Sequence, residues 1–426
     1  MSRFLLRPPQ SRLTGALPPM DVVVLGAGPA GAAAAVALAA KGFTTAVVSK
    51  GVTTSARDLS SGAVVSPVRG LSSHAPVGLV QGLSSRALSA LTEAGLAPAA
   101  QCASGPAARV VIWSGERSER GREGLVEREA FDAALRSCLC RSSICWIDAA
   151  ARSVTFADEL WQVETSEGPI RGRTLIDARG RHARRSDERG PLLVSWSLSL
   201  KSDPPITART AVVALDDGWC WWAMTQSGMV HAQFVTSARQ QLDREQLARQ
   251  IQVAARQLPD VALPVDQLIA QGSVSACAAV ARYSQPSRGP GHLRIGDATV
   301  AMDPLSGNGI HEAVRSARVA VAAVNSYLHG EPWSVVARFV DERSRELWRR
   351  SVSAAADFYR LQAVHSASEF WTSAATAYAR AVTAASGTPA CEGRFEMRPV
   401  LNYERIELRR VWVSSEFPRG VIRHEV

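Results

Sequence analysis

The chain of 426 residues is too long for one ordinary hydrophobic core, so two interleaved domains are expected. Its 46% hydrophobic and 20% charged residues are typical of a globular protein and exclude a disordered or membrane-embedded chain. The formal net charge of +9 is carried almost entirely by arginine, because Lys41, Lys50 and Lys201 are the only lysines. This charge reflects either genome composition or an acidic partner. No DNA-binding motif accompanies it, so nucleic acid is excluded as the expected partner.

The seven cysteines show no CxxC spacing, which favours reduced, buried thiols over a disulfide framework and indicates no metal site. Residues 1–20 lack the apolar centre of a signal peptide and are expected to form an N-terminal arm. No segment reaches the roughly 18 uninterrupted apolar residues of a membrane helix. We therefore expect a cytoplasmic protein without stable membrane insertion.

The first motif lies between a predicted strand and a predicted helix. A short β-branched run over residues 21–25 leads directly into the sequence GAGPAG at 26–31. An alanine-rich helix follows and is expected to end at Gly42, and a second strand is expected over 44–49. This strand–turn–helix setting is the one that a dinucleotide-binding GxGxxG motif requires.

Each glycine of this motif has a separate physical role. Gly26 would form the tight turn, Gly28 would let the backbone approach a pyrophosphate, and Gly31 would let helix and strand pack closely. The free N–H groups of the first helical turn, including that of Ala30, would face the phosphates. These four positions are the first candidate cofactor-binding residues.

The end of the second strand leaves the nucleotide open. An acidic residue usually binds the ribose there, whereas this chain has Ser49 and Lys50. A serine hydroxyl binds a ribose hydroxyl more weakly than a carboxylate does, and Lys50 would suit a phosphorylated ribose. Both are candidate cofactor-binding residues, but they do not decide between FAD and NADP.

Three later segments resemble motifs of the FAD-dependent monooxygenase and halogenase superfamily. Residues 57–67 resemble its R-x-x-x-x-G-x-x-x-x-P stretch, which would place Arg57 along the FAD pyrophosphate. Residues 128–135 resemble its R-x-x-F-D-x-x-L helix, in which Arg128 would reach the cofactor. Residues 174–181 resemble the strand that ends in D-A-x-G and returns to the nucleotide-binding sheet.

The most specific resemblance is the segment GDATVAMDPLSGNG at residues 296–309, which matches the motif G-D-A-x-x-x-x-D-P-x-x-G-x-G of the same superfamily. The resemblance implies that Asp297 binds hydroxyls of the ribityl chain. It also implies that the next turn opens a helix over 310–327, whose N–H groups stabilise negative charge on the flavin. The turn contributes the candidate cofactor-binding residues Pro304, Gly307, Asn308 and Gly309.

The substrate side is predicted from alternating sequences. The alternation over 193–200 and 230–235 indicates an antiparallel sheet that forms the floor of a substrate pocket. Trp219, Trp221 and Trp222 lie in a strand between these segments, so their rings occupy both strand faces. At least one is expected to face the pocket, and the alternative is that all three only cover a core.

The tryptophan-rich strand also resembles the W-x-W-x-I-P motif of flavin-dependent tryptophan halogenases. Here Ala223 and Met224 replace the isoleucine and proline. None of the three lysines stands where those halogenases have their active-site lysine. The departures put halogenation in doubt.

Together these patterns predict an α/β fold: an FAD-binding doubly wound parallel sheet of the GxGxxG type, an inserted antiparallel-sheet substrate domain, and a helical C-terminal region. The FAD-binding domain is expected over 21–185 and 286–330, with part of 60–110 contributing to the substrate side. The substrate domain is expected over 186–285. The helical region is expected over 331–426 and ends in a strand.

Segments 357–360, 368–371 and 397–408, with the D-P-L-S-G turn, resemble the flavoprotein monooxygenases of cysteine tryptophylquinone biogenesis. That resemblance implies hydroxylation of a tryptophan in a peptide or small protein precursor, through a flavin C4a-hydroperoxide. FAD would be the cofactor, O2 the co-substrate, and NAD(P)H or a separate reductase the electron source. An acidic precursor would suit the positive charge. The alternatives are a small-molecule aromatic hydroxylase, a flavin halogenase and a geranylgeranyl-type flavin reductase.

Two residues are candidate catalytic acids or bases. Asp303 lies inside the late flavin motif and His311 lies in the first turn of the following helix. Each has a purely structural alternative, because Asp303 could cap the turn and His311 could pack as an ordinary helix residue.

Overall fold

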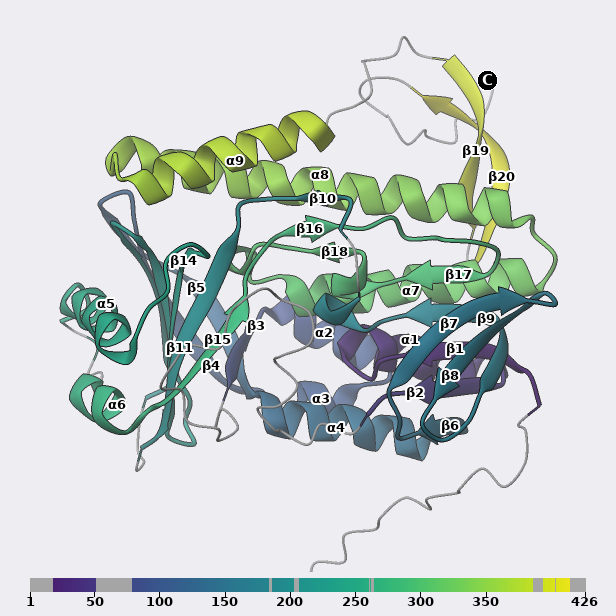
Figure 1. The fold of residues 1–426 in the computed structure, drawn as a ribbon, viewed down its shortest axis with the longest axis horizontal. Coiled ribbons are helices and arrows are strands. Elements are labelled where there is room, and N and C mark those ends of the chain that lie inside the picture. Colours follow the sequence, from purple (N-terminus) through teal and green to yellow (C-terminus); the bar gives the residue numbers. More distant parts are fainter. Residues whose placement is uncertain are drawn as a thin grey trace, which may run out of the picture.

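The computed structural model describes residues 18–50, 79–183, 186–202, 207–259, 261, 264–385, 394–402 and 404–413. Figure 1 shows two large sheets lying side by side, with a long helix running over both. The α/β fold predicted from the sequence is confirmed: an FAD-type doubly wound sheet, a second sheet and C-terminal helices are all present. Arg57 and its motif lie outside the described residues.

The first sheet has seven strands, in the order β6-β2-β1-β9-β8-β7, with β17 also paired to β9. Strands β6, β2, β1, β9 and β17 are parallel, and the hairpin β7–β8 extends the sheet antiparallel to β9. Their bounds are β1 Met20–Leu25, β2 Thr45–Val48, β6 Ile144–Ile147, β7 Ala151–Ala157, β8 Leu160–Thr165, β9 Ile170–Asp177 and β17 His292–Arg294. The parallel strands consist mainly of Val, Ile, Leu and Ala because both of their faces are covered.

Five helices accompany this sheet and enclose its main core. Their bounds are α1 Pro29–Ala40, α2 Ser85–Glu93, α3 Ala97–Ala100, α4 Arg128–Arg141 and α7 Gly309–Leu328. Helix α1 is mostly alanine, and its small side chains let it pack closely against α7. This close packing brings the N-terminal ends of the two helices to the same region.

The second sheet has eight strands in the order β15-β11-β14-β13-β12-β4-β5-β3. All neighbouring pairs are antiparallel except β12 and β4, which are parallel. The bounds are β3 Val80–Leu83, β4 Ser104–Trp113, β5 Glu116–Glu127, β11 Leu193–Lys201, β12 Arg209–Leu215, β13 Gly218–Met224, β14 Met229–Ser237 and β15 Ser273–Ala278. Strands β3 to β5 thus bring residues 80–127 into the second sheet. This contribution extends farther along the chain than the part of 60–110 that was expected.

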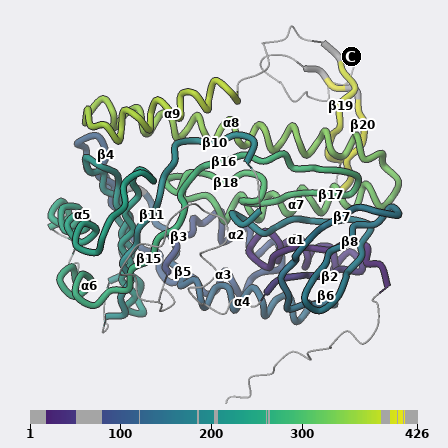
Figure 2. The backbone as a smooth tube through the Cα atoms, viewed as in Figure 1, coloured from purple at the N-terminus to yellow at the C-terminus, as the bar shows by residue number. Residues whose placement is uncertain are grey.

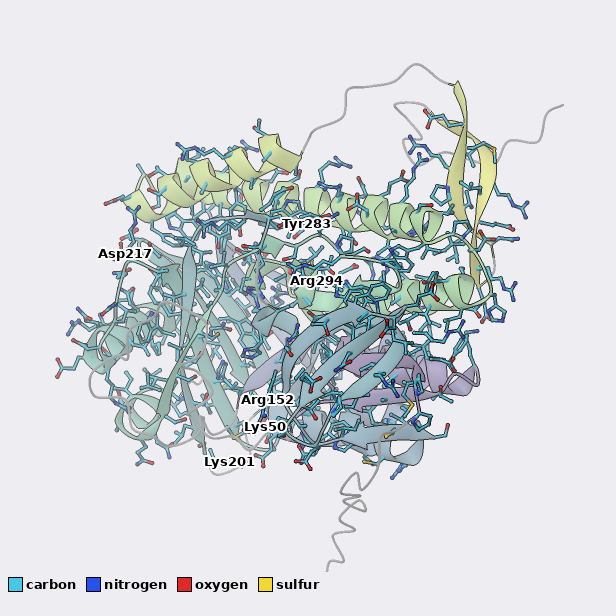
Figure 3. The ribbon with its side chains drawn as sticks, turned by 45° about the vertical axis from the view of Figure 1, so that its right-hand side comes forward. Lys50, Arg152, Lys201, Asp217, Tyr283 and Arg294 are labelled. Carbon is cyan, nitrogen blue, oxygen red and sulfur yellow. The ribbon has the colours of Figure 1, made fainter. Side chains whose placement is uncertain are left out.

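Helices α5 (Arg244–Arg256) and α6 (Val265–Gln271) cover one face of this sheet with an apolar core. The opposite face points toward the first sheet and is called the flavin-side face below, because it carries Trp219, whose contacts lead to the late glycine motif. Figure 3 marks the two ends of the sheet, with Asp217 near the C-terminal helices and Lys201 at the far end.

Short elements connect the two sheets. They are the three-stranded sheet β10 Glu188–Arg189, β16 Arg282–Tyr283 and β18 Val300–Ala301, and the 3-10 turns η2 Gly180–His182, η3 Gly296–Ala298 and η4 Pro304–Ser306. The three turns follow the ends of strands β9 and β17 and strand β18, so they bring the carboxyl edge of the first sheet toward the second.

The C-terminal region consists of α8 (Trp333–His365), α9 (Glu369–Ala385) and the hairpin β19 (Arg394–Asn402) and β20 (Arg405–Val413). The sequence predicted one terminal strand, and the structure has two because the alternating stretch folds back. The Ser326 hydroxyl of α7 holds the second strand by accepting the Ile406 N–H at 2.6 Å. Figure 2 shows α8 running beside α7 and on toward the second sheet. Among the described helices, none has the length and apolar character needed to span a bilayer.

Candidate active site

The GxGxxG turn has the geometry that its sequence predicts. Gly26 has φ of +99°, and a Cβ there would lie 2.6 Å from the carbonyl oxygen of Ala178. A Cβ on Gly31 would collide with the carbonyl oxygen of Gly26. A Cβ on Gly28, in contrast, would meet no atom within 4 Å. Gly26 and Gly31 are therefore required by the protein itself, whereas Gly28 borders open space.

The end of β2 lies beside this turn. The Gly26 N–H donates to the Val48 carbonyl at 2.9 Å, and the Ser49 N–H donates to the Ile147 carbonyl at 3.1 Å. Ser49 is half-buried and Lys50 is exposed. Both predicted nucleotide contacts are thus at the carboxyl edge of the parallel sheet, where ligands of such sheets bind.

The start of the late motif lies between α1 and α7. Gly296 has φ of +58°, and a Cβ there would lie 3.0 Å from the Cβ of Ala30 and 3.6 Å from that of Ala313. The Gly296 N–H donates to the Ser316 hydroxyl at 2.8 Å. The two glycine motifs, about 270 residues apart, are therefore in direct contact, and Asp297 projects from this junction.

Arg181 connects Asp297 to the segments that follow β15 and β18. Its Nε donates to Asp297 Oδ2 at 3.1 Å, Nη1 to the Val280 carbonyl at 2.8 Å, and Nη2 to the Met302 carbonyl at 3.0 Å. Burial lowers the pKa of the nearby Arg282, and Arg181 lowers it further. Arg181 directly follows the D-A-x-G strand end, which is the one local signal in the sequence that points to it.

The turn before α7 leaves its helix N-terminus free. Pro304 begins the 3-10 turn and Gly307 ends it with φ of +59°. A Cβ on Gly307 or on Gly309 would meet no atom within 4 Å. Asn308 precedes the helix, and its side chain makes no capping hydrogen bond to the first turn. The N–H groups of the first turn of α7 thus face open space, and they form the positive end of the helix dipole.

Asp303 is the centre of a buried polar cluster. Its Oδ1 accepts the Leu305 N–H at 2.8 Å, which caps the turn. Its Oδ2 accepts the hydroxyls of Tyr359 in α8, at 3.1 Å, and of Tyr378 in α9. The indole Nε1 of Trp219 donates in turn to the Tyr359 hydroxyl at 3.1 Å. The cluster joins the late motif, the second sheet and both C-terminal helices.

Burial raises the pKa of the Asp303 carboxyl, and the hydrogen bonds from Tyr378, Leu305 and Tyr359 partly offset that effect. Burial also raises the pKa of both tyrosines, and the neighbouring Asp303 raises it further. The tyrosines are therefore neutral donors, and the hydrogen bonds from Leu305, Tyr359 and Tyr378 to Asp303 all suit a carboxylate. The geometry assigns Asp303 a positioning role, and its acid or base role stays a prediction.

His311 lies in the first turn of α7 and is half-buried. Its Nδ1 is 3.3 Å from Glu312 Oε1, and Glu312 also accepts a bond from Arg315 at 3.1 Å. The side chain is thus part of a local charged group at the helix start. Its catalytic role also stays a prediction.

Arg128 begins α4 as expected. It donates to Gln81 of β3 at 2.9 Å and to Asp132 at 2.9 Å, and its guanidinium lies 5.6 Å from the centre of the Phe131 ring. It therefore lies where β3, β5 and α4 meet, at the side of the second sheet nearest to α2 and α3.

The three tryptophans of β13 separate as strand alternation requires. Trp219 and Trp221 belong to the flavin-side face, and the Trp221 ring lies 5.7 Å from that of His231. Trp222 is buried on the opposite face, in the core beneath α5 and α6. Of the three candidate pocket residues, Trp222 therefore lies on the face turned away from Trp219 and Trp221, since successive side chains of a strand point to opposite faces.

The flavin-side face is unusually polar for a sheet surface. The Ser199 hydroxyl is 2.7 Å from His231 Nδ1, and Gln233 donates to the Ser195 hydroxyl. Burial lowers the pKa of His231 to about 4, so the ring is neutral at pH 7. Sequence alternation predicted this sheet, but these serines, His231 and Gln233 were not recognised as lining residues. No cluster of three or more possible metal ligands occurs among the described residues.

Comparison with known proteins agrees with this geometry. The model of an FAD binding domain family matches residues 21–101. The peptidyl tryptophan dihydroxylase QhpG, essential for tryptophylquinone cofactor biogenesis, is 29% identical, with a TM-score of 0.73 over 95% of this chain and 89% of its own. The chain thus carries an FAD-binding domain and is similar over nearly its whole length to an FAD-dependent monooxygenase. None of the curated proteins matches significantly.

More distant relatives of this flavoprotein share its fold. The flavin-dependent halogenase CmlS is 16% identical with a TM-score of 0.66, covering 94% of this chain and 86% of its own. HpxO of Klebsiella pneumoniae, solved with FAD and uric acid, is 16% identical with a TM-score of 0.58, covering 85% and 93%. At such identities these two structures support the fold alone.

The residues of this flavoprotein fit FAD. Open space lies at Gly28, Gly307 and Gly309, the positions where a cofactor must approach the backbone. Gly28 and the α1 N-terminus would hold the pyrophosphate, and Asp297 would hold ribityl hydroxyls. The uncapped N-terminus of α7 would face the flavin ring. This enzyme is therefore an FAD-dependent oxidoreductase of the monooxygenase type.

Proposed function

We propose that the enzyme hydroxylates a tryptophan side chain within a peptide or small protein precursor of a tryptophylquinone cofactor. The observation that carries this proposal is the 29% identity to a peptidyl tryptophan dihydroxylase over 95% of the chain. The same comparison spans the flavin motifs, the second sheet and α8 and α9. The residues of the Asp303 cluster come from all three of these parts.

When bound and reduced, FAD would activate O2 and supply an electrophilic oxygen to an electron-rich ring. The protein's part is to bind, orient and exclude water. Trp221 is half-buried on the flavin-side face and offers an aromatic surface that suits an indole ring, and Trp219 is buried beside it against Tyr359. The N-terminus of α7 would stabilise negative charge beside the cofactor. Asp303, fixed by two tyrosines, would hold the turn that aims this helix.

Halogenation is not favoured by the three lysines. Lys41 is ion-paired with Glu404 near the terminal hairpin, and Lys50 and Lys201 are exposed. None belongs to the Asp303 cluster. A halogenase that relays its oxidant through a lysine would need one beside the aromatic surface of β13.

The partner proposed is an acidic peptide or small protein, which suits the formal charge of +9. The electron source is NAD(P)H or a separate reductase. The proposed location is the cytoplasm, where a precursor can be modified before export.

The deciding experiment is mass spectrometry of candidate precursors after incubation with the holoenzyme, a reductant and 18O2. Incorporation of labelled oxygen at one tryptophan is the expected result. Label in a free aromatic metabolite, with every peptide unchanged, would instead make the enzyme a small-molecule hydroxylase. Oxygen-independent turnover with loss of a substrate double bond would make it a flavin reductase.

A further inference from the structure

Three side chains on the flavin-side face have buried polar atoms without any hydrogen-bond partner. They are Arg109 Nε, Glu123 Oε1 and Thr210 Oγ1, three of nine such atoms in the described part of the chain. An unsatisfied buried polar atom is costly, so native structures rarely leave several of them together. Such a group is explained when a ligand supplies the missing partners.

Strand register brings the three side chains together. Thr210 of β12 is directly paired with Arg109 of β4, and Glu123 of β5 is paired with Ala107, two residues before Arg109. Ala107 is packed with Ala223 of the tryptophan-bearing strand, so this is the flavin-side face. Directly paired and diagonal neighbours on one face of a sheet are within reach of long side chains.

No ion pair within 4.0 Å joins Arg109 and Glu123 to each other or to another described residue, so no described residue neutralises either charge. Thr210 is buried, whereas Arg109 and Glu123 are half-buried. The Glu123 carboxylate fills the space beside Gly82 of β3, so a Cβ on Gly82 would displace it. Each of the three side chains is thus held by the sheet and keeps one buried polar atom that no described residue partners.

The chemistry of the group selects its ligand. Arg109 offers an N–H donor, Glu123 offers an acceptor, and the Thr210 hydroxyl can do either. A carboxylate repels a phosphate, so an anion alone does not fit. Each residue of a peptide carries one backbone N–H donor and one C=O acceptor, and a free amino acid carries an ammonium and a carboxylate; either pair of groups satisfies all three side chains.

The position favours a peptide over a free amino acid. Val212 of β12 is paired with Trp221, and Thr210 lies two residues from Val212 on the same strand. Two strand residues span about 7 Å. The group therefore lies beyond Trp221 by the length of about two residues of an extended substrate. Lys201 marks the same end of the sheet in Figure 3.

We propose that Arg109, Glu123 and Thr210 form a subsite that binds the main chain of the substrate next to the tryptophan that is oxidised. This inference rests on the proposed function, because it assumes that the substrate lies on the flavin-side face. It makes these residues determinants of substrate length, and it leaves the oxygen transfer itself to the flavin.

The test compares Arg109→Gln, Glu123→Gln and Thr210→Val holoenzymes with wild type on three probes. The probes are a capped pentapeptide with a central tryptophan, free L-tryptophan and 3-methylindole, which shares the ring but has no main chain. Arg122→Gln and Glu119→Gln are matched controls, since both residues are exposed on β5 near the subsite. FAD content and the unfolding midpoint are measured for each variant to verify folding.

We expect the Arg109 and Glu123 variants to raise KM for the pentapeptide about 10- to 100-fold, with KM for 3-methylindole and the kcat values unchanged. The controls should behave as wild type. Equal effects on free L-tryptophan and the pentapeptide would identify a subsite for one amino acid and overturn the peptide assignment. An unchanged peptide KM in well-folded variants, or equal increases for 3-methylindole, would overturn the subsite altogether.

Equilibrium binding separates this inference from the proposed function. A fluorescently labelled pentapeptide is titrated with the oxidised holoenzyme, which requires no turnover. Binding that is weakened by the Arg109 and Glu123 variants supports the subsite even when no oxygen is incorporated into the peptide. Hydroxylation of the peptide by all variants at wild-type KM supports the function and refutes the subsite.

Discussion

The indole Nε1 of Trp219 donates a 3.1 Å hydrogen bond to the hydroxyl of Tyr359. The two residues are 140 positions apart, and the bond joins strand β13 of the second sheet to helix α8. The Tyr359 hydroxyl in turn donates to Asp303, so a series of hydrogen bonds connects strand β13 to the turn before α7. A substitution at Tyr359 or Tyr378 is therefore expected to affect both the second sheet and this turn.

Tyr378→Phe and Tyr359→Phe each remove one donor to the buried Asp303 carboxylate. We expect each to lower the free energy of unfolding by about 1–3 kcal/mol. We also expect each to reduce the rate of hydroxylation more than it reduces the affinity for FAD. Urea unfolding and single-turnover kinetics measure the two effects. Tyr327→Phe is the control, since Tyr327 packs against Trp333 and is outside the cluster. Full activity in both variants would show that the turn does not depend on the tyrosines.

The glycines of the first motif predict two different failures. Gly28→Ala places a methyl group in open space, so the apoprotein should stay stable while FAD affinity falls by about tenfold or more. Gly26→Ala forces a Cβ against the Ala178 carbonyl and should destabilise the apoprotein as well. Apoprotein unfolding and FAD titration distinguish these outcomes. Normal FAD binding by Gly28→Ala would remove this glycine from the cofactor site.

The tryptophans of β13 are expected to divide by face. Trp221→Phe should change KM for the aromatic substrate, with little change in stability. Trp222→Phe should lower the free energy of unfolding by about 1–3 kcal/mol, because it leaves a cavity in the core beneath α5 and α6, and KM should not change. Steady-state kinetics and urea unfolding of the pair test the assignment. A KM effect limited to Trp222→Phe would reverse it.

Stability should fall between pH 6.5 and pH 4. Burial lowers the pKa of His231 to about 4. The unfolded chain takes up a proton near pH 6.5, whereas the folded chain does so only near pH 4, so the unfolded state binds more protons in this window. The contribution of His231 is at most on the order of 3 kcal/mol. It is present above pH 6.5 and is lost as the pH falls.

Urea unfolding at pH 7 and at pH 4.5 measures this effect. His231→Asn should reduce the loss of stability between the two values. Ser199→Ala is the control, because it removes the hydrogen bond but leaves the ring buried. An identical pH dependence in wild type and His231→Asn would mean that the folded protein accepts the proton at this position without cost.

The sequence predicted the parts of the site that depend on local geometry. The turn at Gly26 and Gly28 needs only a strand and a helix close by, and the turn at Gly307 needs only its own φ angle. Both lie within a few residues of their supports, so a short motif carries enough information. The fold class followed because such motifs occur at fixed places in a doubly wound sheet.

The parts that sequence did not predict depend on long-range pairing. Tyr378 reaches Asp303 from a helix 75 residues away, and no local pattern indicates which face of α9 meets the turn. Thr210 meets Arg109 through a parallel pair of strands about 100 residues apart. Which face of β13 carries Trp222 depends on the register of this strand with its neighbours. In each instance, the missing information was the relative position of two distant elements.

Helix α8 has one further consequence. Its 33 residues span about 50 Å, from the terminal hairpin and α7 at one end to Trp113 at the other. The Trp113 indole donates to the Phe358 carbonyl at 3.1 Å, so the far end of the helix is fastened to the second sheet. Because α8 is attached at both ends, it opposes separation of the two sheets. Under the proposed function, a substrate protein would therefore have to present its tryptophan on a loop or an unfolded segment.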